Sequence, residues 1–481
     1  MLNMLKQQAN MAFTENGALT YASTMSDCLD LFATVGAIRS ADESEIERRF
    51  MRAFAENPDI AMRILFYGRD IRGGLGERRV FRTILRWLAF NEPASLRKNI
   101  ARVPTFGRWD DVLVLLDTPC AVDALRLIDK QLHADMQSEG HVSLLGKWLP
   151  SVNTSNREAV FMAKRIARFM GMTDAEYRRT VVGLRRKIGI IENNLREQDY
   201  TFDYEHLPSR ALFKYRKAFE RNDEYRYDDY LMEVRYGNAR MNTSGVMPYE
   251  IIRTCLSGCT NSERASLDAA WNALEDFTND EDAIVVMDGS GSMYWSGDPR
   301  PIDVAMSLAI YFAERSKGGF RNHFITFSEN PRLVEIKGRD IVEKARYCRD
   351  FDEVANTNLQ AVFELILRTA VENELTQAQL PSRLYIISDM EFDSCARGAS
   401  VTNFERARRR FAENGYALPE VIFWNVASRN TQQPVRENDR GVALVSGCTP
   451  RLFAQVTGQV TTPYELMMSV IGSDRYAEIC A

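Results

Sequence analysis

The stretch Asp282-Ala-Ile-Val-Val-Met-Asp288-Gly-Ser290-Gly-Ser292 decides the fold of the C-terminal part of this 481-residue chain. Its apolar, β-branched run, residues 284–287, is short and predicts a buried parallel strand. Asp288, Ser290 and Ser292 follow in the turn that leaves the carboxyl end of this strand, where open α/β sheets build their ligand sites. One carboxylate and two hydroxyls at such a point form a hard-oxygen site, which suits Mg²⁺ or Mn²⁺.

Two later segments supply what this site lacks. Thr357, in Asn356-Thr357-Asn358, precedes an apolar helical pattern, and the apolar run 384–389 predicts a second strand that ends on Asp389. Together these residues resemble the metal-ion-dependent adhesion site of von Willebrand factor A domains. The resemblance implies that a metal ion is held, partly through water, by Asp288, Ser290, Ser292, Thr357 and Asp389. The alternative is an ordinary polar turn that caps a helix.

Residues 279–481 alternate strand and helix patterns, which predicts an α/β, doubly wound parallel sheet of the A-domain type. The expected strands are residues 284–288, 323–327, 333–336, 384–389, 421–426 and 442–445. The expected helices are residues 302–315, 341–348, 359–371, 404–414, 451–456 and 464–471.

Residues 1–278 instead predict one helix after another, an all-α irregular array of HEAT-like type without a strict repeat. The expected helices include residues 45–56, 60–67, 78–90, 109–116, 121–136, 157–170 and 174–192. The change of pattern sets the expected domain boundary between residues 278 and 279.

Composition narrows the class of protein. A hydrophobic content of 45% and a charged content of 26% are typical of a soluble globular protein, and no apolar run is long enough to span a membrane. The N-terminus lacks the pattern of a secretory signal, and the eight scattered cysteines predict reduced thiols in a cytoplasmic protein. The four histidines have no triad partners, which argues against hydrolase chemistry. A phosphotransferase with Asp288 as nucleophile would need an aspartate where Ser290 stands. We therefore expect no enzyme.

Basic residues gather in the helical part. Residues 281–481 carry 22 basic and 27 acidic residues, so the whole net charge of −5 lies there, whereas residues 1–280 are neutral but patchy. Two basic segments, 63–108 and 164–187, can form either solvated helix faces or a groove for a nucleic acid backbone. The candidate RNA-binding residues are Arg69, Arg72, Arg78, Arg79, Arg108, Lys147, Arg178, Arg185, Arg186, Lys187, Lys214, Arg216 and Lys217.

The order of helical array and metal-site domain resembles the Ro ribonucleoprotein family, whose helical TROVE module is followed by an A domain. The sequences of residues 69–77 (Arg-Asp-Ile-Arg-Gly-Gly-Leu-Gly-Glu) and 107–111 (Gly-Arg-Trp-Asp-Asp) more closely resemble an uncharacterised bacterial and eukaryotic family of the same layout. The Ro resemblance implies binding of small structured or misfolded RNAs.

Two functions follow as expectations. The first is a cytoplasmic, non-enzymatic RNA-binding scaffold whose metal site binds a carboxylate of a partner protein, with Tyr294 and Trp295 at the rim. The second is an A-domain adaptor that binds only proteins, for example an AAA+ ATPase. Neither involves a membrane or sequence-specific binding to DNA.

Overall fold

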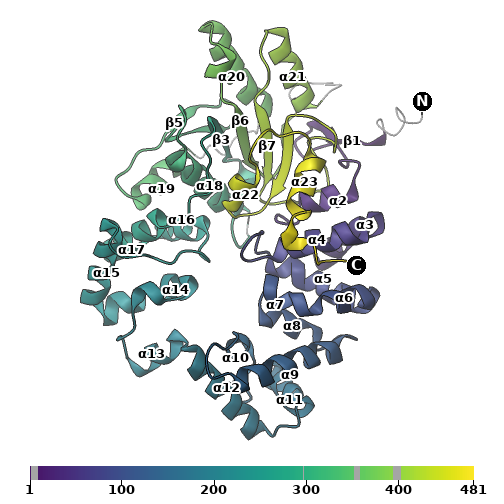
Figure 1. The fold of residues 1–481 in the computed structure, drawn as a ribbon. Coiled ribbons are helices and arrows are strands. Elements are labelled where there is room, and N and C mark those ends of the chain that lie inside the picture. Colours follow the sequence, from purple (N-terminus) through teal and green to yellow (C-terminus); the bar gives the residue numbers. More distant parts are fainter. Residues whose placement is uncertain (2–8, 296, 352–357, 394–401) are drawn as a thin grey trace. The chain divides into compact units, whose positions relative to one another are not determined.

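The computed structural model describes residues 1, 9–295, 297–351, 358–393 and 402–481 (Figure 1). The chain forms two compact units. The first comprises Met1–Ile64 and Pro208–Ala477, and the second comprises Leu65–Leu207 and Glu478–Ala481. These bounds differ from the division at residue 278, although the change from helices to alternating strands and helices does fall between α17 (Asn261–Asn272) and β3 (Ala283–Asp288).

A six-stranded sheet forms the centre of the first unit, in the order β5-β4-β3-β6-β7-β8. All neighbouring strands are parallel except the edge strand β5, which is antiparallel to β4. The chain moves outward from β3 to one side and then returns to pair β6 with the other side of β3. The doubly wound fold predicted from the sequence is therefore present, with its switch point between β3 and β6. The other strands are β4 (His323–Phe327), β5 (Leu333–Glu335), β6 (Arg383–Ser388), β7 (Glu420–Asn425) and β8 (Val442–Ser446).

Helices cover both faces of this sheet, which explains why every residue of β3 is buried. Ile284 and Val286 face a core that they share with helices α20 (Leu359–Glu372) and α21 (Asn403–Glu413). On the other face, the ring of Phe312 in α18 (Pro301–Arg315) lies 5.1 Å from that of Tyr385. The remaining helices after β4 are α19 (Ile341–Arg349), α22 (Arg451–Gln455) and α23 (Pro463–Ile471).

Helix α18 is buried on all sides, from Pro301 to Ala313. A helix that is apolar all round needs a second cover, and α16 (Pro248–Ser257) packs on it from the helical part of the chain. The C-terminal end of that helical part thus shares a core with the α/β sheet. Its other helices are α14 (Ser209–Asn222), α15 (Glu224–Tyr236) and α17.

The N-terminal residues also belong to the first unit, and they contain a hairpin that the sequence analysis missed. Strands β1 (Met11–Phe13) and β2 (Leu19–Tyr21) pair antiparallel around Asn16-Gly17, with Gly17 at φ +81°. Asn-Gly is a strong hairpin signal, so the prediction of helices alone before residue 278 was wrong here. Two helices follow, α2 (Asp27–Phe32) and α3 (Glu43–Glu56).

The second unit is helical, and α4 (Pro58–Arg69) leads into it from the first. Its core includes Phe66, whose ring meets those of Phe81 and Phe106 edge-on at 5.4 Å each. Gly189, at φ +63°, ends α12 four residues earlier than predicted because its left-handed backbone closes the last turn. The helices are α5 (Arg78–Asn91), α6 (Pro93–Asn99), α7 (Val103–Phe106), α8 (Trp109–Val112), α9 (Ala121–Gln137), α10 (Leu145–Trp148), α11 (Arg157–Phe169), α12 (Asp174–Ile188) and α13 (Ile191–Glu197). No helix in the described part of the chain is long and apolar enough to span a membrane.

A buried ion cluster joins the helices at the start of the second unit. Asp111, which has no exposed surface, accepts from Arg69 Nε at 2.8 Å, Arg82 Nε at 2.6 Å and the Arg108 backbone N–H at 2.9 Å. Arg82 also pairs with Asp110 at 2.6 Å, so two guanidinium groups balance two carboxylates. A side chain at Gly107 would collide with the Asp111 carboxylate, which explains the glycine in Gly107-Arg-Trp-Asp-Asp.

We expect Asp111→Ala to lower the free energy of unfolding of the second unit by about 3–5 kcal/mol, because it leaves buried Arg69 without its carboxylate. Asp117→Ala is the matched control. Asp117 pairs with Arg165 at 3.1 Å but is 77% exposed, so its loss should cost less than about 1 kcal/mol. Chemical denaturation followed by circular dichroism measures both, and equal losses would contradict the structural role of the cluster.

Candidate metal centre

The predicted metal-site residues lie at the switch point of the sheet. Asp288 is the last residue of β3, and Asp389 directly follows β6, the strand paired with β3. Because both strands are parallel, their carboxyl ends meet at one edge. Ser290 and Ser292 follow in the turn and short 3₁₀ helix after β3. The residues that position the site are thus the apolar runs of two central strands.

Hydrogen bonds hold both oxygens of the Asp288 carboxylate. The backbone N–H of Ser290 donates to Oδ1 at 2.9 Å, and the hydroxyl of Ser388 donates to Oδ2 at 2.6 Å. The hydroxyls of Ser290 and Ser292 lie 3.0 Å apart. Ser388 in turn accepts from the Met390 backbone N–H at 3.0 Å. The turn therefore presents two hydroxyl groups beside a fixed carboxylate.

Both carboxyl groups are buried, and this raises their pKa values. Burial, followed by repulsion from Asp389, raises the pKa of Asp288 to about 7. Burial also raises the pKa of Asp389, against the opposing effects of the Ser292 hydroxyl and the Arg429 guanidinium. Two buried carboxylates that repel each other favour a proton or a cation between them. This electrostatic situation fits a divalent ion.

The donor set also fits Mg²⁺ or Mn²⁺. Within the described residues, no three His, Cys, Asp or Glu side chains gather as they would around zinc. The available donors are carboxylate and hydroxyl oxygens, the ligands that Mg²⁺ prefers. The structure brings together four of the predicted ligands, Asp288, Ser290, Ser292 and Asp389. Thr357 lies outside the described residues.

Arg429 is a site residue that the sequence analysis missed. Its guanidinium donates to Asp389 Oδ2 at 3.0 Å, pairs with Glu15 at 2.9 Å and lies 5.9 Å from the centre of the Trp295 ring. Arg429 follows the end of β7, at the same edge of the sheet as Asp389. That position after a third parallel strand was the signal that could have identified it.

An open cleft of about 610 Å³ lies over these residues. Ser292 and Asp389 line it, together with Trp295, Arg429 and several residues between positions 37 and 48. The predicted rim residues are exposed, Trp295 to 64% and Tyr294 to 39%. Trp295 lines the cleft, so a ligand that reaches Asp389 passes an aromatic side chain.

The N-terminal segment reaches the loop that follows Asp389. Thr14 Oγ1 donates to the Phe392 carbonyl at 2.5 Å, and Glu391 accepts from the Glu15 backbone N–H at 2.9 Å. Asn430 donates to Glu391 at 2.8 Å. These bonds tie residues near the start of the chain to the site loop and fix its path.

Three of the predicted RNA-binding residues have guanidinium groups that contact other parts of the protein, and two of the three are buried. Arg69 is 1% exposed, in the cluster around Asp111. Arg216 is 9% exposed and lies 4.5 Å from the Phe213 ring. Arg185 is half-buried, and its three guanidinium nitrogens donate to the Gly146 and Leu149 carbonyls and the Ser151 hydroxyl. Each of these guanidinium groups therefore has a structural role in the fold.

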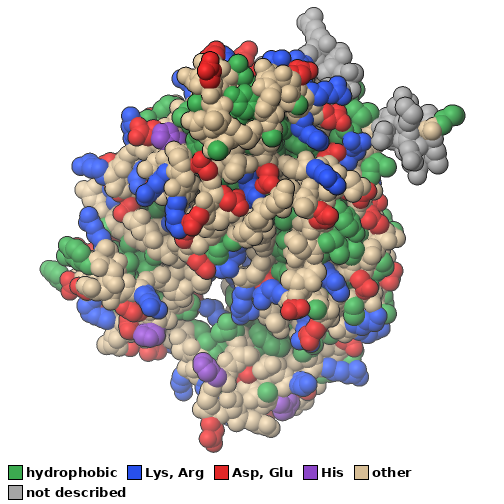
Figure 2. Space-filling view, turned by 45° about the horizontal axis from the view of Figure 1, so that its top comes forward, with side chains coloured by type: hydrophobic (Ala, Val, Ile, Leu, Met, Phe, Trp, Pro, Cys, Tyr) green, Lys and Arg blue, Asp and Glu red, His purple; other side chains and the backbone are tan. Residues whose placement is uncertain are grey.

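The other candidates lie nearer the surface. Arg72, Arg78, Arg79, Arg178, Arg186 and Lys187 are exposed in the second unit, and Lys214 and Lys217 are exposed on α14. Arg108 and Lys147 lie 5.1 and 6.0 Å from the centre of the Trp148 ring. Figure 2 shows lysine and arginine side chains interspersed with aspartate and glutamate over the visible face. The basic residues that cluster in the sequence are therefore scattered over the surface of the folded protein.

The chain is similar to several known proteins and family models. Residues 282–465 match the family model described as Domain of unknown function (DUF7788). An uncharacterized protein, L728, of Acanthamoeba polyphaga mimivirus is 29% identical over 508 residues, which cover 96% of this chain and 87% of that protein. The crystal structure of the Ro (RSR) protein of Deinococcus radiodurans matches with a TM-score of 0.40 and 13% identity, over 94% of this chain and 100% of that chain.

A second family model covers the helical part. Domain of unknown function (DUF2828) matches residues 14–120 and 121–284, which together are more than half of the chain. The match begins at the N-terminal hairpin and ends at β3. The chain therefore belongs to the DUF2828 family.

Proposed function

We propose that this protein is a non-catalytic docking module that binds a carboxylate group of a partner protein through a divalent metal ion. The observation that supports this most is the pair of buried carboxylates, Asp288 and Asp389, beside two serine hydroxyls, with Asp389 and Ser292 lining an open cleft. A site built for catalysis would need a nucleophile or a proton carrier aimed at a substrate. Here both carboxylates are engaged by hydrogen-bond donors of the protein itself.

The proposed contact has three parts. A bound Mg²⁺ would supply a Lewis-acid position for an oxygen of an incoming Asp or Glu side chain. Arg429, beside Asp389, keeps positive charge at the same place and stabilises a second anion. Trp295, mostly exposed at the rim, offers apolar area that excludes water around the contact.

We expect Mg²⁺ or Mn²⁺ to raise the melting temperature of the wild-type protein in a saturable way. At a metal concentration of a hundred times Kd, the free energy of unfolding should increase by about 2.7 kcal/mol. Asp288→Asn should abolish this response. Asp282→Asn, at the other end of β3, is the matched control and should respond as wild type does. Differential scanning fluorimetry after EDTA treatment measures all three. If the metal raised the melting temperature of Asp288→Asn as much as that of wild type, the assignment of Asp288 to the metal site would be wrong.

The same variant gives a pH test. The folded pKa of Asp288, about 7, lies above its ordinary value near 4, so this group stabilises the fold below pH 4 and loses that contribution as the pH rises through 7. In EDTA at pH 8, Asp288→Asn should therefore be more stable than wild type, on the order of a few kcal/mol. The apparent metal affinity of wild type should fall as the pH is lowered through 7, because protons compete with the ion.

Partner binding should need both the metal and the hydroxyl of Ser292. We expect a protein that is recovered on the immobilised full-length chain in Mg²⁺ to be released by EDTA, and to bind Ser292→Ala at least tenfold more weakly. Ser244→Ala, which changes an exposed serine outside the cleft, serves as the control. Binding that is equal in EDTA and Mg²⁺ would show that the metal site is not the docking point.

RNA binding by the second unit is a second candidate. One observation favours it: Arg178 and Arg186 are exposed on α12 and have no carboxylate within ion-pairing distance among the described residues. Val182, 45% exposed, lies between them. Nearby, α12 holds the segment 146–151 through Arg185 and the Tyr177 hydroxyl, so that Lys147 and Arg108 flank Trp148. Cations beside an aromatic ring are the components of single-strand binding sites.

If these cations contact phosphates, binding of a structured RNA with a single-stranded end should weaken on the order of 10³-fold between 50 and 200 mM salt for six contacts. The double change Arg178→Glu and Arg186→Glu should lower affinity for many RNAs alike and reduce the salt slope by about 1.5. Arg408→Glu with Arg409→Glu, on α21, makes the same charge change in the first unit and should have little effect. Fluorescence anisotropy with the full-length chain measures both.

The absence of salt-sensitive RNA binding by the wild-type chain at 50 mM salt would leave docking through the metal site as the function. Arg185 is unsuitable for this test, because its reversal would remove three internal hydrogen bonds and disturb the fold.

A further inference from the structure

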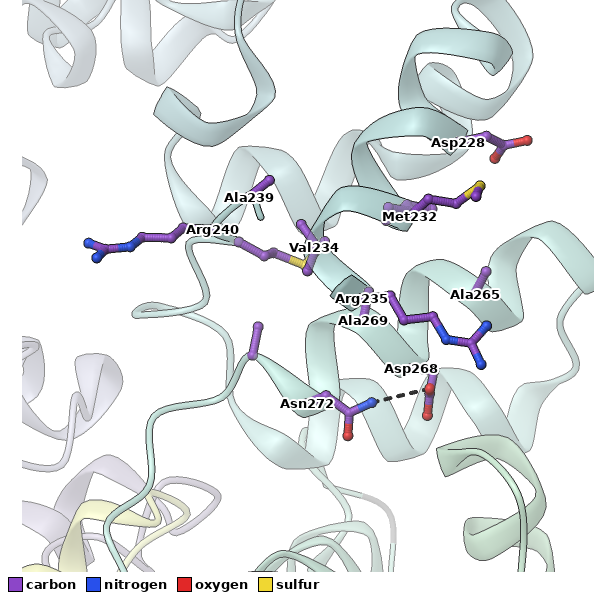
Figure 3. Close-up of a pocket in the computed structure, with 13 residues that line it drawn as sticks. Asp228, Met232, Val234, Arg235, Ala239, Arg240, Ala265, Asp268, Ala269 and Asn272 are labelled. Carbon is purple, nitrogen blue, oxygen red and sulfur yellow. Dashed lines mark hydrogen bonds between the residues drawn. The ribbon is translucent and has the colours of Figure 1, made fainter. Parts of the chain in front are cut away.

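A groove between α15 and α17 lies in the first unit (Figure 3). Its volume is about 820 Å³, larger than the cleft over the metal site. Leu231 and Ala269, 6% and 9% exposed, form part of an apolar floor, and Ala265 and Ala273 continue it along α17. Small side chains on α17 let another backbone approach closely, as helix–helix contacts require.

Helix α15 carries apolar side chains on two opposite faces. Tyr227, Tyr230 and Leu231 are buried against the unit. Tyr225, Met232 and Tyr236 are 86%, 53% and 70% exposed. At 100° per residue, the three exposed side chains fall within an arc of about 40°, on the side away from the buried face. A helix with a second, exposed apolar stripe marks an interaction surface, and tyrosine and methionine are enriched in such surfaces.

Charged side chains at the rim of the groove lack partners. Among the described residues, no ion pair or hydrogen bond involves the charged groups of Arg235, Arg240 or Asp228, although the Arg240 carbonyl accepts from the Tyr230 hydroxyl at 3.0 Å. Asp268, in contrast, accepts from the Ile341 backbone N–H at 3.0 Å and from Asn272 at 3.2 Å. Figure 3 shows Arg240 and Asp228 at opposite ends of the groove, with the Arg235 guanidinium at the same end as Asp228, beside Ala265 and Asp268. The groove therefore has one arginine at one end and an aspartate with a second arginine at the other.

We propose that this groove binds an amphipathic helix of a partner protein. The apolar stripe of that helix would lie on Leu231, Met232 and Ala269, and an acidic side chain would meet Arg235. This mode of binding is helix-in-groove recognition, in which residues at spacings of three, four and seven anchor the ligand.

Nucleic acid fits this surface less well. Helix α15 carries Glu224, Asp228, Asp229 and Glu233 on or near its exposed side, against Arg226 and Arg235. Phosphates would be repelled by these carboxylates, and the small, apolar floor offers no flat ring for a base.

The test uses the full-length chain in EDTA, so that the metal site cannot contribute. A phage library of 18-residue helical peptides is selected on the immobilised protein, and an enriched peptide is synthesised with a fluorescent label. We expect enriched sequences to share an apolar stripe at helical spacing with an acidic residue beside it. Anisotropy then gives the Kd for wild type and for three variants.

Ala265→Trp fills the groove from an exposed helical position, and it should weaken the peptide at least tenfold without changing the circular dichroism spectrum. Arg235→Glu should also weaken it, and a peptide whose acidic residue is changed to lysine should regain affinity for that variant. Arg221→Glu, on exposed α14 surface outside the groove, makes the same charge change and should bind as wild type does.

Four outcomes would overturn the proposal. They are the absence of enriched peptides, equal binding to Ala265→Trp and wild type, enrichment of basic rather than acidic sequences, and displacement of the peptide by RNA. Sedimentation of the protein alone tests whether a second copy of the chain occupies the groove. A dimer that Ala265→Trp converts to monomer would assign the groove to a second copy of the chain and overturn the partner helix.

Discussion

Two carboxylates that lie together, away from water, constrain the whole first unit. Asp288 and Asp389 end neighbouring strands, so the sheet itself forces them to the same place. Their charge is tolerated because Ser388, the Ser290 backbone and Arg429 all donate to them. Through Arg429, the same requirement draws in Glu15 from the opposite end of the sequence. One electrostatic problem therefore organises four distant segments of the chain.

Arginine serves as an internal structural residue throughout this protein. On β6, Arg383 is 2% exposed, and its guanidinium pairs with Glu281 and Glu420 and donates to two carbonyls beyond α22. The guanidinium groups of Arg69, Arg185 and Arg216 likewise contact other segments of the protein. A planar fork of five donors can satisfy several acceptors at once, which suits it to joining segments of irregular backbone. High arginine content therefore says less about nucleic acid here than the sequence clusters implied.

Local patterns predicted most of the fold, and contacts between distant segments account for what they missed. The strands and helices of residues 279–481 were predictable because buried parallel strands are short apolar runs between amphipathic helices. Asp288, Ser290, Ser292 and Asp389 were predictable because each stands at or just after a strand end. Arg429 also follows a strand end, that of β7, but only the folded sheet shows that its guanidinium meets Asp389. The hairpin at Asn16-Gly17 has a local signal, but its strands are three residues each and join the loop at Gln433. The inward direction of Arg69 could not be read from its neighbours.

The way the N-terminal hairpin is held has a consequence for synthesis on the ribosome. Thr20 donates to the Gln433 carbonyl, a residue 413 positions later. At 5–20 residues per second, the hairpin waits about 20 to 80 s before its partner emerges. Residues 65–207, which form a unit of their own, need no such delay for most of their contacts. The middle of the chain can therefore fold while the ribosome is still working, whereas the first unit closes only once the residues around Gln433 have emerged, and its first strands lack these partners in the interval.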